Sequence, residues 1–251
     1  MSIRTDILLA GLLLCMAAGP SGAQPAGVQQ LFGQGNQYYE NSNFEQAIEV
    51  YEAIVKKGVY DAGVFYNLGN AYYRVNNIGK SILNYEKALR LSPRDADIKD
   101  NLKFVRSYLK EPGEGVLRSI VNIFTMNELT VFCSVVYFLF MAGILLSLFV
   151  RNEALKTVNT VTAVLLAAGL VWWYGKYSVS EKTVSAIVIS SPAEVRNGPG
   201  TDYTVGFTVP EGKKIRILSR KEDWYAVGVM QYEPQKVILK GWLPAGIVEK
   251  I

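Results

Sequence analysis

Two long apolar runs, separated by only seven residues, restrict what this 251-residue chain can fold into more than any other feature. Residues 131–150 contain no charged side chain, and residues 158–174 end in three aromatic residues. Runs of this length and composition are typical of helices that cross a bilayer, and aromatic side chains favour its interface with water. A buried helical hairpin of a soluble domain is the alternative, but neither run has the polar face of such a helix. The sequence therefore predicts two transmembrane helices joined by a loop at residues 151–157.

The N-terminus has the pattern of an exported protein. A basic residue precedes a short apolar stretch, and the small residues Ser21 and Ala23 form a cleavage site before Gln24. This pattern predicts a signal peptide over residues 1–23. Cys15 raises lipidation as an alternative, although the residue before it is bulkier than lipoproteins usually carry.

An exported N-terminus followed by two spans places both ends of the chain outside the cytoplasm. The loop between the spans carries Arg151 and Lys156, which the positive-inside rule favours on the cytoplasmic side, although Glu153 weakens the bias. Residues 115–130 alternate apolar and polar side chains at helical spacing, which predicts an amphipathic segment along the membrane surface. We therefore expect a two-pass protein of the bacterial inner membrane, with both folded modules in the periplasm.

A sequence repeat precedes the spans. Superposing residues 28–61 on residues 62–95, a shift of 34 positions, aligns Gly35 with Gly69. Further identical pairs include Tyr38 with Tyr72, Tyr39 with Tyr73, Ile48 with Ile82, Tyr51 with Tyr85, and Glu52 with Glu86. A small residue at the glycine position lets paired helices approach closely, while a tyrosine fills the angle between them. Residues 96–110 carry apolar side chains at helical spacing and predict a capping helix, or the first helix of a truncated third repeat.

This period and these positions resemble the tetratricopeptide repeat family over about residues 28–110. The resemblance implies α-helical hairpins whose first helices form a concave, partner-binding face. By the family's register, that face carries Phe32, Asn36 and Tyr39 in the first repeat, and Tyr66, Asn70, Tyr73 and Arg74 in the second. Alternatively, these residues only follow the family consensus. Some members clamp a terminal carboxylate with a lysine where Phe32 and Tyr66 stand here, so carboxylate capture is not expected.

Beyond residue 183 the chain changes to short β runs with glycine and proline turns. Residues 214–218 alternate charged and apolar side chains, and turn residues cluster at 198–200 and 210–212. The order of several elements resembles a bacterial SH3 domain: Val195-Arg196 before Gly198-Pro199-Gly200, then Gly212, Trp224 and Gly241-Trp242-Leu243. The resemblance implies a small all-β barrel over residues 183–251.

The same resemblance implies a peptide groove, including one for cell-wall peptides. Tyr203, Trp224 and Tyr225 would line that groove. Alternatively, Trp224 and Trp242 belong to the barrel core, as expected in so small a barrel.

Composition removes several classes of function. The chain has no histidine, which excludes Ser-His-Asp sites and histidine-ligated zinc. Its net charge is only +4, and its lysine and arginine residues are interspersed with acidic ones, so no nucleic-acid partner is expected. No motif places two carboxylates for catalysis, and the two cysteines indicate no disulfide framework. We expect a protein that is not an enzyme and needs no cofactor or metal.

The order of these modules resembles the BatE-type aerotolerance-operon (Bat) proteins. The expected fold class is multidomain α + β, with tetratricopeptide hairpins, a transmembrane hairpin and an SH3-like barrel. The resemblance implies a scaffold that works with Bat membrane proteins bearing von Willebrand A domains, and indirectly with a MoxR-type ATPase, in oxidative or envelope stress. A peptidoglycan-binding sensor that acts through the SH3-like domain is the alternative.

Overall fold

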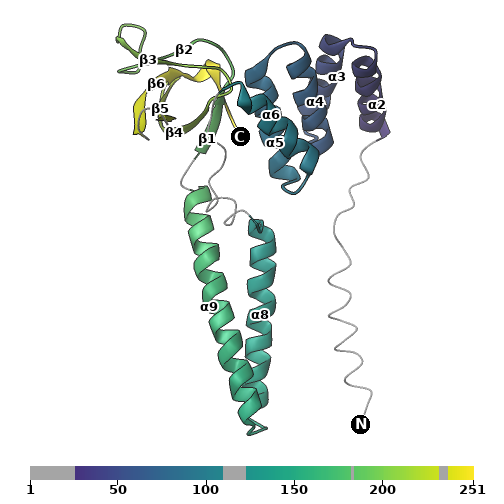
Figure 1. Ribbon diagram of the computed structural model, residues 1–251, viewed down its shortest axis with the longest axis vertical. Coiled ribbons are helices and arrows are strands. Elements are labelled where there is room, and N and C mark those ends of the chain that lie inside the picture. The colour runs from purple at the N-terminus through teal and green to yellow at the C-terminus, as the bar shows by residue number, and fades with distance from the viewer. Residues whose placement is uncertain (1–25, 110–122, 182–183, 232–236) are drawn as a thin grey trace. The chain divides into compact units, whose positions relative to one another are not determined.

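The computed structural model describes residues 26–109, 123–181, 184–231 and 237–251 (Figure 1). The chain divides into two compact units, residues 1–59 and 60–251, each of which is described by itself. The fold class is confirmed: an α-helical tetratricopeptide region, two long helices and a curled antiparallel β half-barrel. The expected signal peptide and residues 115–122 of the expected surface segment lie outside the described residues.

The first unit contains a close-packed pair of helices, α2 (Ala26–Glu40) and α3 (Phe44–Lys56). A methyl group at Gly35 would lie 2.6 Å from Cε1 of Tyr51, a distance that real side chains do not reach. The hydroxyl of Tyr51 donates a hydrogen bond to Oδ1 of Asn36 over 2.7 Å. The glycine–tyrosine contact is therefore the close approach that the repeat pattern predicted.

The second repeat, in the second unit, has the same internal contacts. Its helices are α4 (Ala62–Arg74) and α5 (Ile78–Leu91). A methyl group at Gly69 would lie 2.8 Å from Cδ1 of Tyr85, whose hydroxyl donates to Oδ1 of Asn70 over 2.5 Å. Both repeats thus use one glycine, one tyrosine and one asparagine, at equivalent positions of the repeat, to fix their helices together.

Helix α6 (Ala96–Ser107) keeps the register of α4. Asp95 caps α6 by accepting from the amide of Ile98, just as Asp61, at the equivalent position of the preceding repeat, caps α4. The buried residues of α6 also stand 34 positions after buried residues of α4: Ile98 after Val64, Leu102 after Leu68, and Val105 after Ala71. Helix α6 therefore repeats the buried pattern of a first repeat helix, which favours the second of the two alternatives that the sequence left open.

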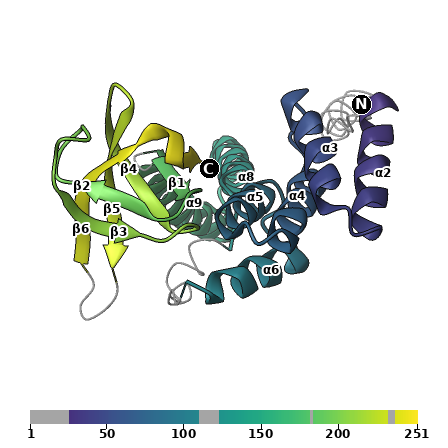
Figure 2. The ribbon, with the colours of Figure 1, turned by 90° about the horizontal axis from the view of Figure 1, so that it is seen from above.

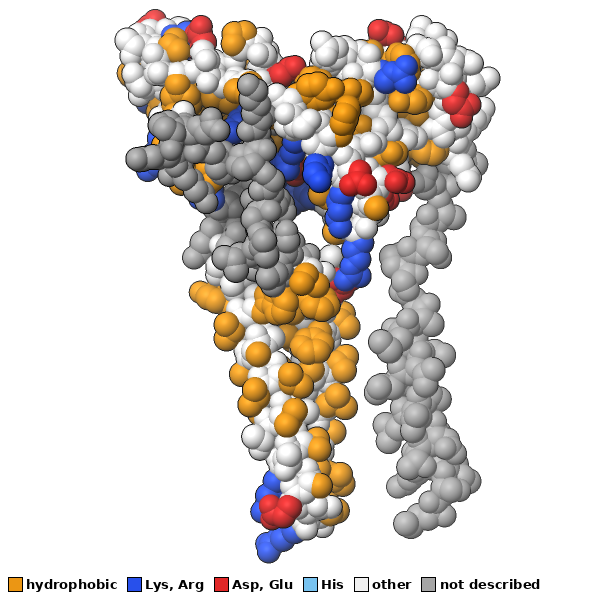
Figure 3. Space-filling view, in the orientation of Figure 1, with side chains coloured by type: hydrophobic (Ala, Val, Ile, Leu, Met, Phe, Trp, Pro, Cys, Tyr) orange, Lys and Arg blue, Asp and Glu red, His pale blue; other side chains and the backbone are white. Residues whose placement is uncertain are grey.

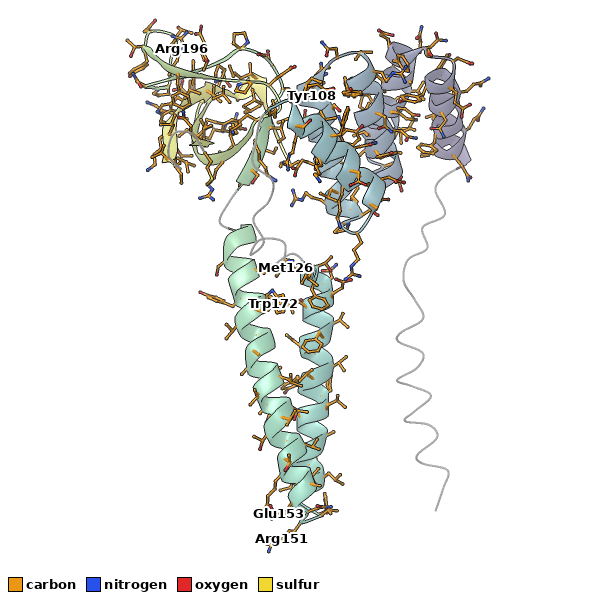
Figure 4. All side chains as sticks on the ribbon, viewed as in Figure 1. Tyr108, Met126, Arg151, Glu153, Trp172 and Arg196 are labelled. Carbon is orange, nitrogen blue, oxygen red and sulfur yellow. The ribbon has the colours of Figure 1, made fainter. Side chains whose placement is uncertain are left out.

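Helices α8 (Met126–Ser147) and α9 (Glu153–Glu181) form a long hairpin. Thr125 and Glu128 form a capping box at the start of α8, so α8 begins within the expected surface segment rather than after it. Hydrophobic side chains cover the visible face of the hairpin, and charged ones gather at its tip, where Arg151 lies (Figures 3 and 4). Both helices are long and apolar enough to cross a membrane.

The remaining residues form one antiparallel sheet that curls around its own core (Figure 2). Its strands are β1 (Val184–Val188), β2 (Ala193–Arg196), β3 (Val205–Val209), β4 (Lys214–Lys221), β5 (Trp224–Gln231), β6 (Val237–Pro244) and β7 (Val248–Lys250). They lie in the order β3-β2-β6-β5-β4-β1-β7, and a 3₁₀ turn, Ala245–Ile247, precedes β7. Only two residues separate the end of α9 from the start of β1.

Candidate protein-binding site

The expected concave-face residues are partly used by the fold itself. Asn36 and Asn70 accept hydrogen bonds from the tyrosines of their own repeats, as described above. Asn101 of α6 adds two further bonds in the second unit, donating Nδ2 to Oδ1 of Asn70 over 3.2 Å and to the hydroxyl of Tyr66 over 2.9 Å. The two asparagines therefore hold helices together, whatever else they contact.

The aromatic residues at the start of this face also pack within their repeats. The ring centroids of Phe32 and Tyr51 lie 6.1 Å apart, and those of Tyr66 and Tyr85 lie 5.9 Å apart. Both pairs are tilted by the same 52°, so the two repeats use one packing arrangement. Tyr39 meets Phe44 edge to face at 5.3 Å. Phe32, Tyr39 and Tyr66 are half-buried.

Three aromatic residues form an exposed cluster between α4 and the end of α6, and we call Tyr73, Phe104 and Tyr108 the aromatic trio. Phe104 lies 5.8 Å from Tyr73 and 5.7 Å from Tyr108, centroid to centroid, in edge-to-face contacts. The hydroxyls of Tyr73 and Tyr108 are hydrogen-bonded at 3.2 Å. Phe104 nevertheless exposes 52% of its surface and Tyr108 58%. Exposed clustered aromatic side chains are typical of protein interfaces.

The trio borders a shallow hollow of about 350 Å³. Tyr73, Arg74, Asn76, Ile78 and Tyr108 line it, and Figure 4 labels Tyr108. The hydrogen bond with Tyr108 raises the pKa of Tyr73 above its ordinary value of 10.0. Arg74 supplies the positive charge of the lining. The hollow can therefore receive an apolar or aromatic side chain beside an acidic one.

The sequence reasoning selected Tyr73 and Arg74 but missed Phe104 and Tyr108. The period of the repeat was the signal that could have found them. Phe104 stands 34 positions after Asn70 and Tyr108 stands 34 positions after Arg74, both of which were selected. Extending the concave-face register into residues 96–110 would have placed both aromatic residues on the binding face.

The structure does not gather the expected groove residues of the β domain into one exposed surface. Tyr203 is 50% exposed and lies over Gly198, in a loop where Nη1 of Arg196 donates to the carbonyl oxygens of Thr201 and Tyr203, both over 2.8 Å. Tyr225, by contrast, belongs to the buried core cluster of the sheet.

The two tryptophans of the β domain are neither fully exposed nor part of its core. Trp224 and Trp242 are half-buried, and neither is a member of the buried core cluster. The core is made instead by smaller side chains on the inner face, such as Val195, Val227 and Leu243. Within the part of the chain that the structure describes, no group of histidine, cysteine or acidic residues could hold a metal ion.

Comparisons with known proteins agree with the repeat assignment. The model of the tetratricopeptide repeat family matches residues 62–95, and no curated protein matches the chain. Similar solved structures include a point mutant of MamA (17% identity, 35% of this chain and 64% of that chain, TM-score 0.32). PcrH in complex with the chaperone-binding region of PopD shares 14% identity over 61% of this chain and 98% of that chain, with a TM-score of 0.33.

The type III secretion chaperone SycD of Yersinia enterocolitica, in complex with a peptide of the translocator YopD, is also similar. It shares 14% identity over 60% of this chain and 98% of that chain, with a TM-score of 0.34. These values are too low to transfer a ligand from those proteins to this chain. The family match and the fold together describe a tetratricopeptide protein-binding scaffold followed by a β-rich domain.

Proposed function

We propose that this chain is a two-pass inner-membrane scaffold of the BatE type, which holds a protein partner against the aromatic trio. The exposure of Phe104 and Tyr108 beside Arg74 is the observation that carries the proposal. Clustered exposed apolar side chains on a folded surface mark interaction sites, whereas single exposed ones need no such explanation. The partner segment expected here is extended or helical, with an aromatic or aliphatic side chain next to a carboxylate.

Membrane anchoring explains how a short repeat array suffices. Two complete repeats offer a small surface, so a contact made by them alone is weak. Two membrane helices would confine the repeats to the neighbourhood of other membrane proteins and raise the effective concentration of a partner there. The resemblance to Bat proteins suggests partners with von Willebrand A domains, and through them a MoxR-type ATPase, in the response to oxidative or envelope stress.

The topology of the proposal places the repeats and the β domain in the periplasm. The apolar hairpin returns the chain to the side from which it came, and its tip carries Arg151 and Lys156 toward the cytoplasm. Glu153 pairs with Lys156 at 2.7 Å, which reduces the charge that favours this orientation. Protease added to intact spheroplasts should therefore cleave both terminal modules, whereas protection of either one would contradict the topology.

In-cell photocrosslinking tests the partner site directly. A photoreactive amino acid at position 104 or 108 should yield a crosslinked protein that mass spectrometry can identify. The matched control is position 60, where Tyr60 is 69% exposed but lies outside the trio. Equal yields from positions 60, 104 and 108, or no adduct at 104 and 108, would reject the trio as the binding site.

A peptidoglycan sensor remains the second proposal, because Tyr203 is exposed on a loop organised by Arg196. Trp224, half-buried, and Tyr225, in the sheet core, offer a glycan strand less surface. Binding of the full chain in detergent to purified sacculi, compared with a Tyr203→Ala variant, separates this proposal from the scaffold. Retention that does not depend on Tyr203 would count against the groove.

A further inference from the structure

Strand β1 is buried on both of its faces. Ala186 and Val188 point into the core of the sheet, whereas Ile187, between them, is fully buried in a different cluster. That cluster consists of residues from α5 and α6 together with Ile187: Ile82, Leu83, Tyr85, Leu102 and Val105. The outer face of a small barrel normally meets water, so the burial of Ile187 comes from the repeat helices.

Charged side chains join the same elements. The buried carboxylate of Glu86, on α5, accepts from Nη2 of Arg106 on α6, and its other oxygen accepts from Nζ of Lys214 on β4 over 2.9 Å. The neighbouring Lys87 of α5 pairs with Glu249 of β7 at 2.5 Å. A carboxylate that is removed from water needs its cationic partners. Glu86 therefore connects α5 both to α6 and to the sheet.

The backbones of the two modules also approach closely. A methyl group at Gly79, near the start of α5, would lie 2.8 Å from the carbonyl oxygen of Val188 and 3.1 Å from Cα of Ile189. Gly212, at the turn before β4, has a positive φ of 79° and lies against Ile82. Close approach at two glycines indicates a fitted interface rather than an incidental contact.

Within the described residues, α6 is not followed by a helix that packs on it as α5 packs on α4. In a complete repeat the second helix packs at the glycine position, but α6 carries the exposed Lys103 at the position equivalent to Gly69. Leu102 and Val105 of α6 instead join the cluster that holds Ile187. Phe104, between them in sequence, is on the exposed side with the aromatic trio.

We propose that the β domain holds α5 and α6 together where they meet strand β1, and that Ile187 and Lys214 are positioning residues for the partner site. By holding α6 against α5, they fix Phe104 and Tyr108 at the distances from Tyr73 that the trio requires. This inference rests on the proposed function, since it concerns the same site. It assigns to the β domain a role in partner binding that needs no ligand of its own.

Fluorine NMR of the full chain in detergent micelles tests the positioning. With 3-fluorotyrosine incorporated, Tyr73→Phe and Tyr108→Phe variants assign the two trio resonances. Lys214→Ala should shift or broaden both, and the pKa of the labelled residue 73 should fall toward that of free 3-fluorotyrosine as its hydrogen bond to Tyr108 is lost. Lys214→Arg should restore the signals. Lys240→Ala is the matched control, because Lys240 is an exposed cation two strands away, on β6.

Exchanging the charges of the more exposed ion pair between Lys87 and Glu249 gives a second test. Lys87→Glu and Glu249→Lys should each perturb the trio resonances, and the double variant should restore them. The signal of Tyr225, inside the sheet, reports whether the β domain remains folded. Trio resonances that stay unchanged in Lys214→Ala, Ile187→Ala and both single charge reversals overturn the proposal.

Crosslinking separates this inference from the proposed function. With a photoreactive residue at position 104, Lys214→Ala should lower the crosslinked yield several-fold, and Lys214→Arg should recover it. If the unaltered protein captures no partner, the proposed function fails, while the NMR result still decides whether the β domain positions the trio. A full crosslinking yield in Lys214→Ala, despite shifted resonances, would overturn the link to binding.

Discussion

Replacing Gly79 by alanine should destabilise the protein if the β domain lies against α5, and should stabilise it if α5 is exposed there. In an exposed helix, glycine to alanine stabilises by roughly 0.5–1 kcal/mol. Here the added methyl would stand 2.8 Å from a backbone carbonyl oxygen, which cannot rotate away as a side chain end would. Forcing such a group into a packed contact costs about 1–3 kcal/mol. We therefore expect a net loss of about 1–2 kcal/mol in the contact between α5 and β1.

Hydrogen–deuterium exchange with mass spectrometry on the full chain in nanodiscs measures this loss locally. A loss of that size corresponds to amide exchange that is about 5–30 times faster in peptides covering the start of α5 and strand β1. Gly33→Ala is the matched control, because Gly33 is exposed on α2 and an added methyl would meet no atom within 4 Å. That variant should slow exchange in its own helix. If Gly79→Ala slows exchange in the same way, β1 does not lie on α5 and the reasoning is wrong.

Two further predictions concern the repeats themselves. Asp61→Ala removes the side chain that accepts from two amides at the start of α4, and should lower the free energy of unfolding by about 1 kcal/mol. A denaturant titration followed by circular dichroism measures this loss, and Asp61→Asn should retain most of the stability. Equal losses in the two variants would exclude the capping explanation. Tyr51→Phe and Tyr85→Phe each delete one hydrogen bond to an asparagine, so each should cost about 1 kcal/mol in the same titration. A loss confined to one of them would show that the two repeats do not share this contact.

The regular period of the sequence made the repeats predictable. Glycine, tyrosine and aspartate recur at fixed offsets because the same helix pair is built twice, and the structure uses Gly35 and Gly69 in the same way. Identical letters do not always have identical roles, however. Glu52 and Glu86 are aligned, yet Glu52 forms a surface pair with Lys56 while Glu86 is buried between two cations.

The contact between β1 and the repeats was not predicted, although β1 contains a signal for it. A strand with one wet face alternates apolar and polar residues, but Ala186-Ile187-Val188-Ile189 is apolar throughout, as in strands covered on both sides. The sequence of the strand does not show which residues cover it, because the covering residues lie about 100 positions earlier in the chain. Of the groove residues expected from the sequence, Tyr203, Trp224 and Tyr225, the structure places Tyr225 in the core of the sheet, because a strand's own sequence does not show which of its aromatic side chains the curled sheet encloses.

The short connection between α9 and β1 has a mechanical consequence. Two residues between Glu181 and Val184 span at most about 11 Å, even when extended. The end of α9 therefore cannot lie farther than this from the start of β1, whose Ile187 packs with residues of α5. A displacement of the membrane hairpin by more than this length, caused by the bilayer or by a neighbouring protein, would therefore have to move β1 as well.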